Sequence, residues 1–334
     1  MARDTRTASL PFGPATEKLL AAPKKTKPPS RVQHRLIEAA ASIVENDESE
    51  LCFQHTVFCQ TGLPYRDPGD HVRQWQRTQG AAMLVIQAGQ LLQPQKGTIV
   101  DLGLPWGAKP RLILAHLNAQ ALRTGSPIIE AEDSLTAFVK RIRRFDSGRE
   151  IRAFKTQLGR LSSALIRLAI AQGDHIHQID TKVITAFDLW FPKDERQRVL
   201  WPSTIRLSAE YFDSLQAHAV PLLEESVAAL AHSAVALDIY AWLAQRLHRI
   251  KPEKPAFIPW AALKEQFGPD YGHMFNFKRI FRIALKQVLT QYRAACLDLD
   301  DRGMTAWQSP PPVKGRTWQM IRSGKHRPHC LGAS

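Results

Sequence analysis

Apolar residues recur along this chain with two different spacings, and each spacing predicts one kind of element. Spacings of three and four residues predict helices at 31–45, 109–124, 133–144, 148–173, 233–250, 260–267 and 274–292. Short β-branched runs between Gly and Pro predict strands at 81–92, 97–103, 127–132 and 256–260. Alternating residues at 175–191 and 294–309 predict two hairpins, the second turning at Asp301-Arg302-Gly303.

The order of these elements repeats. Helix, short strand, helix, long helix and hairpin follow one another from residue 109 to 191, and again from 233 to 309. This is the order of a winged helix, whose third helix enters the DNA major groove while its hairpin rests on the backbone. We therefore predict an α+β chain with two tandem winged-helix domains, related by architecture and little by residue identity. A generic α+β fold is the alternative.

This repeat divides the chain into five predicted segments. Lys and Pro dominate the first segment, which predicts a flexible basic arm, and the last segment is a basic tail expected to be disordered. The segments are the arm 1–30, an N-terminal winged-helix domain 31–191 for DNA backbone contact, a linker or hinge 192–223, a C-terminal winged-helix domain 224–313 for sequence-specific DNA binding, and the tail 314–334.

The charge of the chain narrows the class of partner. Lys and Arg number 45 against 31 Asp and Glu, a net charge of +14, which indicates a polyanion or an anionic surface as partner. We expect no membrane-spanning segment, because no run of about eighteen apolar residues exists. The four cysteines form no C-x-x-C pair, so we expect reduced thiols and a cytoplasmic protein.

Two helices combine one apolar stripe with a basic face. Lys and Arg number nine against two acidic residues between 138 and 170, and five against none between 274 and 294. Solvated helix faces usually mix the two signs, and like charges at this spacing repel, so an uncompensated basic face favours phosphate contact. The residues that we expect to contact DNA are Arg149, Arg152, Lys155, Thr156, Arg160, Lys278, Arg279, Arg282 and Lys286.

The sequence lacks the motifs of the common catalytic sites. It contains no G-x-x-x-x-G-K-[ST], no H-E-x-x-H and no G-x-S-x-G. His175 and His177 share one face of a predicted strand, and we interpret them as surface histidines of a hairpin. Asp298, Asp300 and Asp301 fit a tight turn better than a metal site. We therefore expect no enzyme, no catalytic residue, no metal and no cofactor.

An ordered series of motifs resembles a known family. The motifs are LPYRDPGDHVRQW, GLPWGAKPRLILAHLNAQALRT, SLTAFVKRI, KTQLGRLSSALI, ALDIYAWLAQRL, PWAALKEQFG and WQSPPPV, spread over about residues 55–313. In this order they resemble the RepA-type replication initiators of theta-replicating plasmids. The resemblance implies tandem winged-helix domains that bind repeated sites, called iterons, at the plasmid origin.

The resemblance also implies partners. Such initiators help open the duplex and bring in the host initiator and the replicative helicase. Many related ones bind the origin as monomers and repress their own promoter as dimers, which links them to plasmid copy control. The resemblance therefore implies dimerisation through the N-terminal winged-helix domain, residues 31–191. A winged-helix transcriptional regulator without a replication role is the alternative. An RNA-binding basic protein and a structural oligomer with an acidic partner are two further hypotheses.

Overall fold

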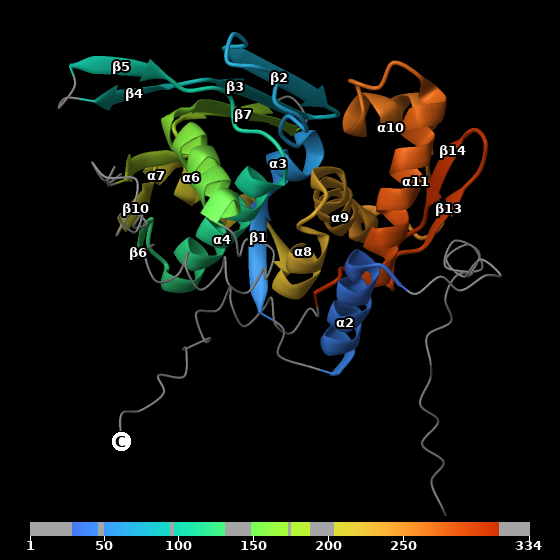
Figure 1. Ribbon diagram of the computed structural model, residues 1–334. Coiled ribbons are helices and arrows are strands. Elements are labelled where there is room, and N and C mark those ends of the chain that lie inside the picture. Colours follow the sequence, from blue (N-terminus) through green and yellow to red (C-terminus); the bar gives the residue numbers. More distant parts are fainter. Residues whose placement is uncertain are drawn as a thin grey trace, which may run out of the picture.

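The computed structural model describes residues 29–45, 50–93, 97–130, 148–172, 175–187 and 204–313 of the 334-residue chain. Helices and strands are mixed throughout this part, as predicted for an α+β chain (Figure 1). The predicted helix 133–144, the tail 314–334 and almost all of the arm 1–30 lie outside the described residues. Within the described part, none of the helices has both the length and the apolar character needed to cross a bilayer.

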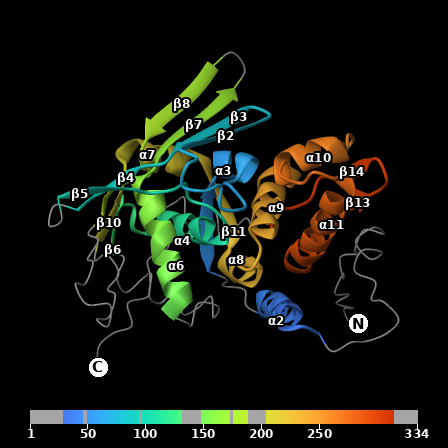
Figure 2. The ribbon, with the colours of Figure 1, turned by 45° about the horizontal axis from the view of Figure 1, so that its top comes forward.

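A four-stranded antiparallel sheet, ordered β2-β3-β7-β8, covers one side of the N-terminal half (Figure 2). Its inner face is apolar because every second residue of β3 is buried, and Leu84 of β3 lies opposite Leu168 of β7. The short helix α3 packs beneath it. These elements are β2 (Gln74–Gln79), β3 (Ala82–Gln87), β7 (Leu165–Gln172), β8 (His175–Thr181) and α3 (Thr56–Thr61).

Helix α4 is the centre of the N-terminal half. It is buried on nearly all sides, and it packs against β1, α6 and α9. As predicted, it ends before Gly125, whose φ of 66° is left-handed, a conformation that glycine adopts at little cost. The helices and strands around it are β1 (Leu51–His55), α4 (Ala108–Thr124), α6 (Gly148–Ser163), α7 (Ala209–His218), β11 (Ala219–Leu223) and α8 (Glu224–Leu230).

Two smaller sheets complete this half. One is three-stranded, in the order β6-β10-β9, and the other is a two-stranded ribbon of β4 and β5. The ribbon exposes Leu92 and Ile99, which lie opposite each other. The strands are β4 (Gln90–Gln93), β5 (Thr98–Asp101), β6 (Ile128–Glu130), β9 (Ile184–Phe187) and β10 (Thr204–Leu207).

The C-terminal half has the predicted order of helix, strand, helix, long helix and hairpin. Its three strands form an antiparallel sheet in the order β12-β14-β13, so the first strand pairs with the last. The elements are α9 (Ala234–Arg246), a 3₁₀ turn (Leu247–Arg249), β12 (Ala256–Pro259), α10 (Trp260–Phe267), α11 (Met274–Gln291), β13 (Leu297–Leu299) and β14 (Gly303–Ala306).

The first described helix, α2 (Arg31–Glu45), joins these C-terminal elements. It packs against α8 and α11, beside which it lies in Figure 1. The Gln291 side chain donates a hydrogen bond of 2.7 Å to the Leu36 carbonyl, and Ser42 donates one of 2.9 Å to Glu225. The helix was predicted at these residues, but as part of the N-terminal domain.

Two predicted elements take a different form. The predicted helix 148–173 is wrong beyond Ser163, because residues 165–172 form strand β7. Ser162 and Ser163 donate to the carbonyls of Leu158 and Arg160 at the helix end, and the next residues pair with β3. The predicted hairpin 175–191 is wrong as well, since β8 pairs with β7 while β9 pairs with β10 in another sheet.

Part of the predicted linker 192–223 is folded. Residues 204–223 form β10, α7 and β11. Strand β10 lies between β6 and β9, and β11 pairs with β1 along its whole length. This segment is therefore built into the N-terminal sheets.

A buried ion pair joins the two halves of the chain. Arg111 on α4 donates to both carboxylate oxygens of Asp238 on α9, at 2.6 and 2.7 Å, and its remaining hydrogens reach the carbonyls of Leu63, Pro64 and Gly107. The two side chains are 4% and 9% exposed. Gly62 lies so close that a Cβ there would collide with the Asp238 carboxylate. The charged pair is thus enclosed and fully hydrogen-bonded.

We predict that Asp238→Asn lowers the free energy of unfolding by about 3–5 kcal/mol, because it leaves the buried guanidinium without its counter-charge. Chemical denaturation would measure this. Asp180→Asn is the control, since its ion pair with Arg167 is half exposed, and should cost less than about 1 kcal/mol. Equal effects of the two substitutions would contradict the role given to Arg111 and Asp238.

Candidate nucleic-acid interface

Helix α11 has one buried and one exposed face. The buried face carries Phe277, Phe281, Leu285 and Val288, each no more than 1% exposed. Of the predicted contact residues on this helix, Arg279, Arg282 and Lys286 are exposed, and Lys278 is half-buried. Among the residues that the structure describes, the side chains of Arg279 and Lys286 have no hydrogen-bond or ion-pair partner. The helix therefore presents unpaired cations to solvent.

Trp260, at the start of α10, holds α11 in place. Its ring is 3% exposed and packs edge-on against Phe277 and Phe281. Two cations of α11 lie against the same ring, with Lys278 Nζ 5.0 Å and Arg282 Cζ 5.2 Å from its centroid. The indole N–H donates to the Asp300 carbonyl at 2.9 Å. One buried ring thus fixes α11 and the hairpin relative to each other.

The β13–β14 hairpin turns where the sequence predicted. The Asp300 carboxylate accepts from the backbone N–H groups of Arg302 and Gly303, both at 2.8 Å, and these bonds hold the pKa of Asp300 below its usual range. Lys278 donates to the Asp301 carbonyl at 3.0 Å. Asp298 and Asp301 are exposed, so the hairpin tip is acidic and its charge does not favour phosphate.

The predicted contact residues of α6 fall into two groups. Arg149 and Arg152 are exposed near the start of the helix, and Thr156, also exposed, donates back to the Arg152 carbonyl at 3.0 Å. Lys155 is half-buried, and this burial lowers its pKa to about 8. Phosphate can reach the first group without any rearrangement of the helix.

Arg160 lies at the other end of α6 and is already engaged. Its guanidinium pairs with Asp67 at 3.4 Å and Asp70 at 3.0 Å, and it donates to the Leu104 carbonyl at 3.2 Å. The side chain is 13% exposed. Arg160 therefore ties α6 to the loop after α3, and phosphate contact by this residue would require those bonds to break.

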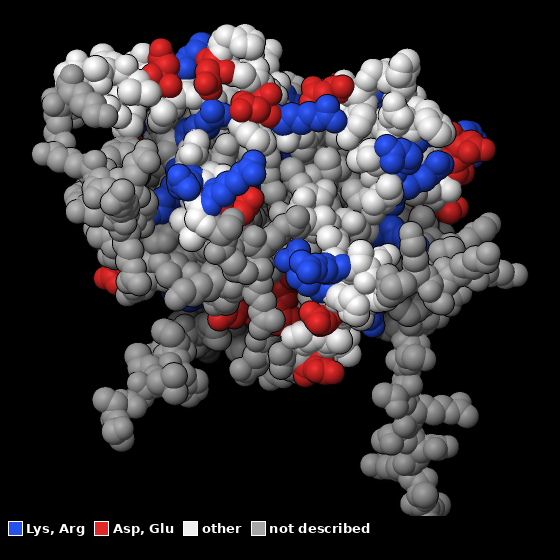
Figure 3. Space-filling model, in the orientation of Figure 1, with Lys and Arg blue, Asp and Glu red and all other residues white. Residues whose placement is uncertain are grey.

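Lys and Arg side chains gather at separate places on one face of the molecule. Figure 3 shows Lys and Arg side chains beside α6 on one side of this face and over α11 on the other. Acidic side chains lie mainly along the upper and lower rims in this view. A single extended polyanion could therefore contact both helices.

Three uncharged residues on the exposed face of α11 were not among the predicted contact residues. Phe275 is 76% and Ile283 50% exposed, and Asn276, also exposed, makes no side-chain hydrogen bond to any described residue. They lie on the face that carries Arg279 and Lys286. The three-and-four spacing that identified the cations would have found them, but only charge was counted.

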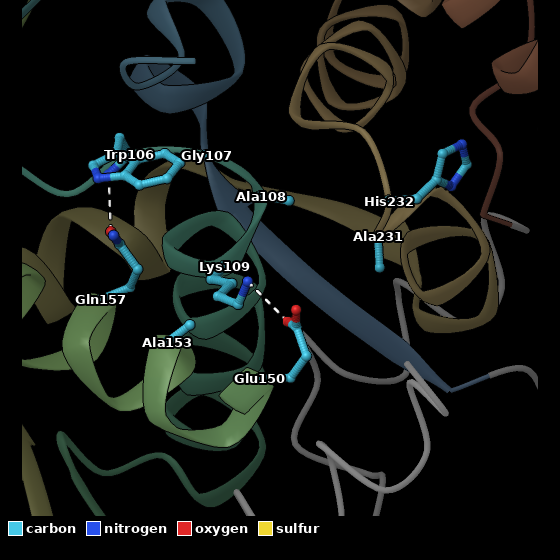
Figure 4. Close-up of a pocket in the computed structure, with 9 residues that line it drawn as sticks. All are labelled: Trp106, Gly107, Ala108, Lys109, Glu150, Ala153, Gln157, Ala231 and His232. Atoms are coloured by element: carbon cyan, nitrogen blue, oxygen red, sulfur yellow. Dashed lines mark hydrogen bonds and ion pairs between the residues drawn. The ribbon is translucent and has the colours of Figure 1, made fainter. Parts of the chain in front are cut away.

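A small pocket lies beside helix α6 (Figure 4). It is bounded by the start of α4, by α6 and by the turn after α8, and a Lys109–Glu150 ion pair of 3.0 Å crosses its mouth. Gln157 accepts from the Trp106 backbone N–H at 2.9 Å. No group of three metal-ligating side chains occurs among the residues that the structure describes.

Comparison with known proteins identifies a matching family and solved structures to which this chain is similar. Residues 104–261 match the family described as plasmid encoded RepA protein. A search of curated proteins finds no match. The crystal structure of selenomethionine derivatives of domains 2 and 3 of RctB has a TM-score of 0.48 at 8% identity, covering 76% of this chain and 99% of that chain. A second structure of RctB domains 2–3 has a TM-score of 0.45 at 9% identity, covering 75% and 96%.

We predict that Lys155 titrates with a midpoint of about 8, and that duplex DNA raises the midpoint, because nearby phosphate favours the charged ammonium. The ¹³Cε resonance of labelled lysine measures this, and its loss in Lys155→Arg identifies it. A midpoint that duplex DNA leaves unchanged would remove Lys155 from the interface.

Proposed function

We propose that the protein is a plasmid replication initiator that binds double-stranded DNA at its origin, on the premise that residues 104–261 match the family described as plasmid encoded RepA protein. The observation that carries DNA binding is the surface of α11, which has three exposed cations, a fourth that is half-buried, and no acid. An α-helix fits the B-DNA major groove, and Arg pairs with two acceptors of guanine there.

Within this proposal the C-terminal half is a winged-helix domain with α11 as its recognition helix. The order of elements and the sheet order β12-β14-β13 support it. Arg279 is the residue best placed to contact a base edge, since it is exposed and unpaired among the described residues. Lys286, about two turns further along the helix, is suited to phosphate.

The N-terminal half is proposed as the second winged-helix domain, with α6 against the DNA backbone. Arg149, Arg152 and Lys155 are its contacts, with Thr156 as a further donor. Arg160 keeps a structural role in this arrangement because Asp67 and Asp70 hold it. The acidic tip of the β13–β14 hairpin does not attract phosphate, so the proposal includes no backbone contact by that wing.

The wider role follows from the family. We propose binding to repeated iterons, opening of the duplex, recruitment of the host initiator and replicative helicase, and a monomer–dimer equilibrium, in the cytoplasm with the plasmid. Repression of its own promoter and copy control are part of the same proposal. The initiator activity would be non-enzymatic, with strand separation driven by the host helicase.

A transcriptional regulator of the same fold is the alternative. The basic face of α11 serves either function equally well. A plasmid-maintenance assay decides between them, with a plasmid that carries the gene and its flanking DNA. Inactivation of the gene abolishes replication of this plasmid only if the protein is an initiator. Competition between duplex DNA and structured RNA tests an RNA-binding function, since the A-form major groove is too narrow for a helix.

Footprinting on DNA around the gene should reveal protected repeats at regular spacing that persist when the salt concentration is raised. Sequence-specific contacts survive salt better than counterion release alone. Uniform protection that disappears with salt would leave only nonspecific phosphate attraction and would contradict the initiator proposal.

Arg279→Ala should weaken binding to the protected site by about 1–3 kcal/mol and relax its sequence preference, because it removes a base contact. Lys286→Ala should weaken all sequences about equally and reduce the salt dependence. Arg167→Ala, in strand β7, is the control. It should change neither the affinity for the protected site nor the salt dependence of binding. Gel-shift titrations at two salt concentrations measure all three. If Arg279→Ala binds the protected site with unchanged affinity and sequence preference, this face of α11 is assigned wrongly.

A further inference from the structure

The exposed face of α11 carries more apolar surface than its packing requires. The opposite face already supplies a complete buried stripe, from Phe277 to Leu289. Phe275 and Ile283 add nothing to it, since 76% and 50% of their surfaces are accessible. Single exposed apolar residues need no explanation, but these two share one face with a row of cations.

The geometry of the helix groups these residues closely. At 3.6 residues per turn, Phe275, Arg279, Arg282, Ile283 and Lys286 lie within roughly 120° of the helix circumference. Along the axis, Phe275 and Ile283 are about 12 Å apart at 1.5 Å per residue. This distance corresponds to about three to four base-pair steps of B-DNA, with Arg279 midway between them.

The charges around the two residues indicate what covers them. Leu92 and Ile99 of the β4–β5 ribbon are equally apolar and exposed, but the ribbon strands carry a single charge, that of Asp101. Phe275 and Ile283 instead lie among Lys278, Arg279, Arg282 and Lys286, with no acidic residue on the helix. An apolar protein partner alone would not require these cations, and phosphate alone would not require Phe and Ile. The major groove offers both phosphate and an apolar group, the C5-methyl of thymine.

We propose that Phe275 and Ile283 recognise two thymine methyl groups, about three to four base pairs apart, on either side of the base pair contacted by Arg279. This inference rests on the proposed function, and it adds the part of the sequence preference that charge cannot provide. A·T pairs would then be selected by apolar contact and the pair between them by the guanidinium.

Deoxyuridine provides a direct probe, because it differs from thymidine only in lacking the methyl group. Each thymine of the footprinted duplex is replaced in turn, and the affinity of the full chain is measured. Two replacements at the stated spacing should each weaken binding about fourfold, the effect of returning one buried CH₂-sized group to water. Ile283→Ala should abolish the sensitivity at one of these positions, and Phe275→Ala at the other.

The matched control is Leu92→Ala, which removes an apolar side chain of comparable exposure, 67%, from the ribbon. It should retain both sensitivities, and thermal unfolding should show that all three variants fold. The proposal is overturned if no replacement weakens the wild-type protein, or if both sensitivities persist in Phe275→Ala and Ile283→Ala. Failure of the proposed function looks different, since the wild-type protein would then protect no discrete site at all.

Discussion

The enclosed ion pair between Arg111 and Asp238 fixes how the two halves of the chain sit against each other. The residues are 127 positions apart, with Arg111 in the first turn of α4 and Asp238 in the second turn of α9. Two charges removed from water are stable only when their hydrogen bonds are satisfied, and here the carboxylate and three carbonyls take up the guanidinium. Burial beside the Asp238 charge also raises the pKa of Tyr65, which keeps that hydroxyl neutral. A rotation of one half against the other would separate these groups.

The orientation of α11 depends on the arrangement of the two halves through a cluster of aromatic residues around Trp260. Trp260 receives edge contacts from two phenylalanines, lies against two cations and donates to the turn of the hairpin. Phe267 connects the same cluster to Trp242 on α9, the helix that carries Asp238. The position of the exposed cations is thus determined by aromatic packing that begins next to the interface between the halves.

Local patterns predicted some of this and could not predict the rest. Helix α11 and its hairpin follow from residues close in sequence, namely the apolar stripe and the Asp-rich turn. Strand β7 does not, because Leu165 and Leu168 continue a helical spacing and only pairing with β3 makes them a strand. The engagement of Arg160 depends on Asp67 and Asp70, which lie 93 and 90 residues earlier. The helical spacing places Phe275 and Ile283 on the face that carries Arg279, but a prediction based on charge alone does not include them.

The packing of α2 against α11 has a consequence for synthesis on the ribosome. Gln291 donates to the carbonyl of Leu36, 255 residues earlier, so one of the first helices to emerge packs against one of the last. Chains are made from the N-terminus, and domains generally fold as they appear. The side chains of Leu36 and Ala40 therefore remain exposed to water, or bound by a chaperone, until α11 has left the ribosomal exit tunnel. Completion of the nascent chain and closure of this contact are consequently coupled in time.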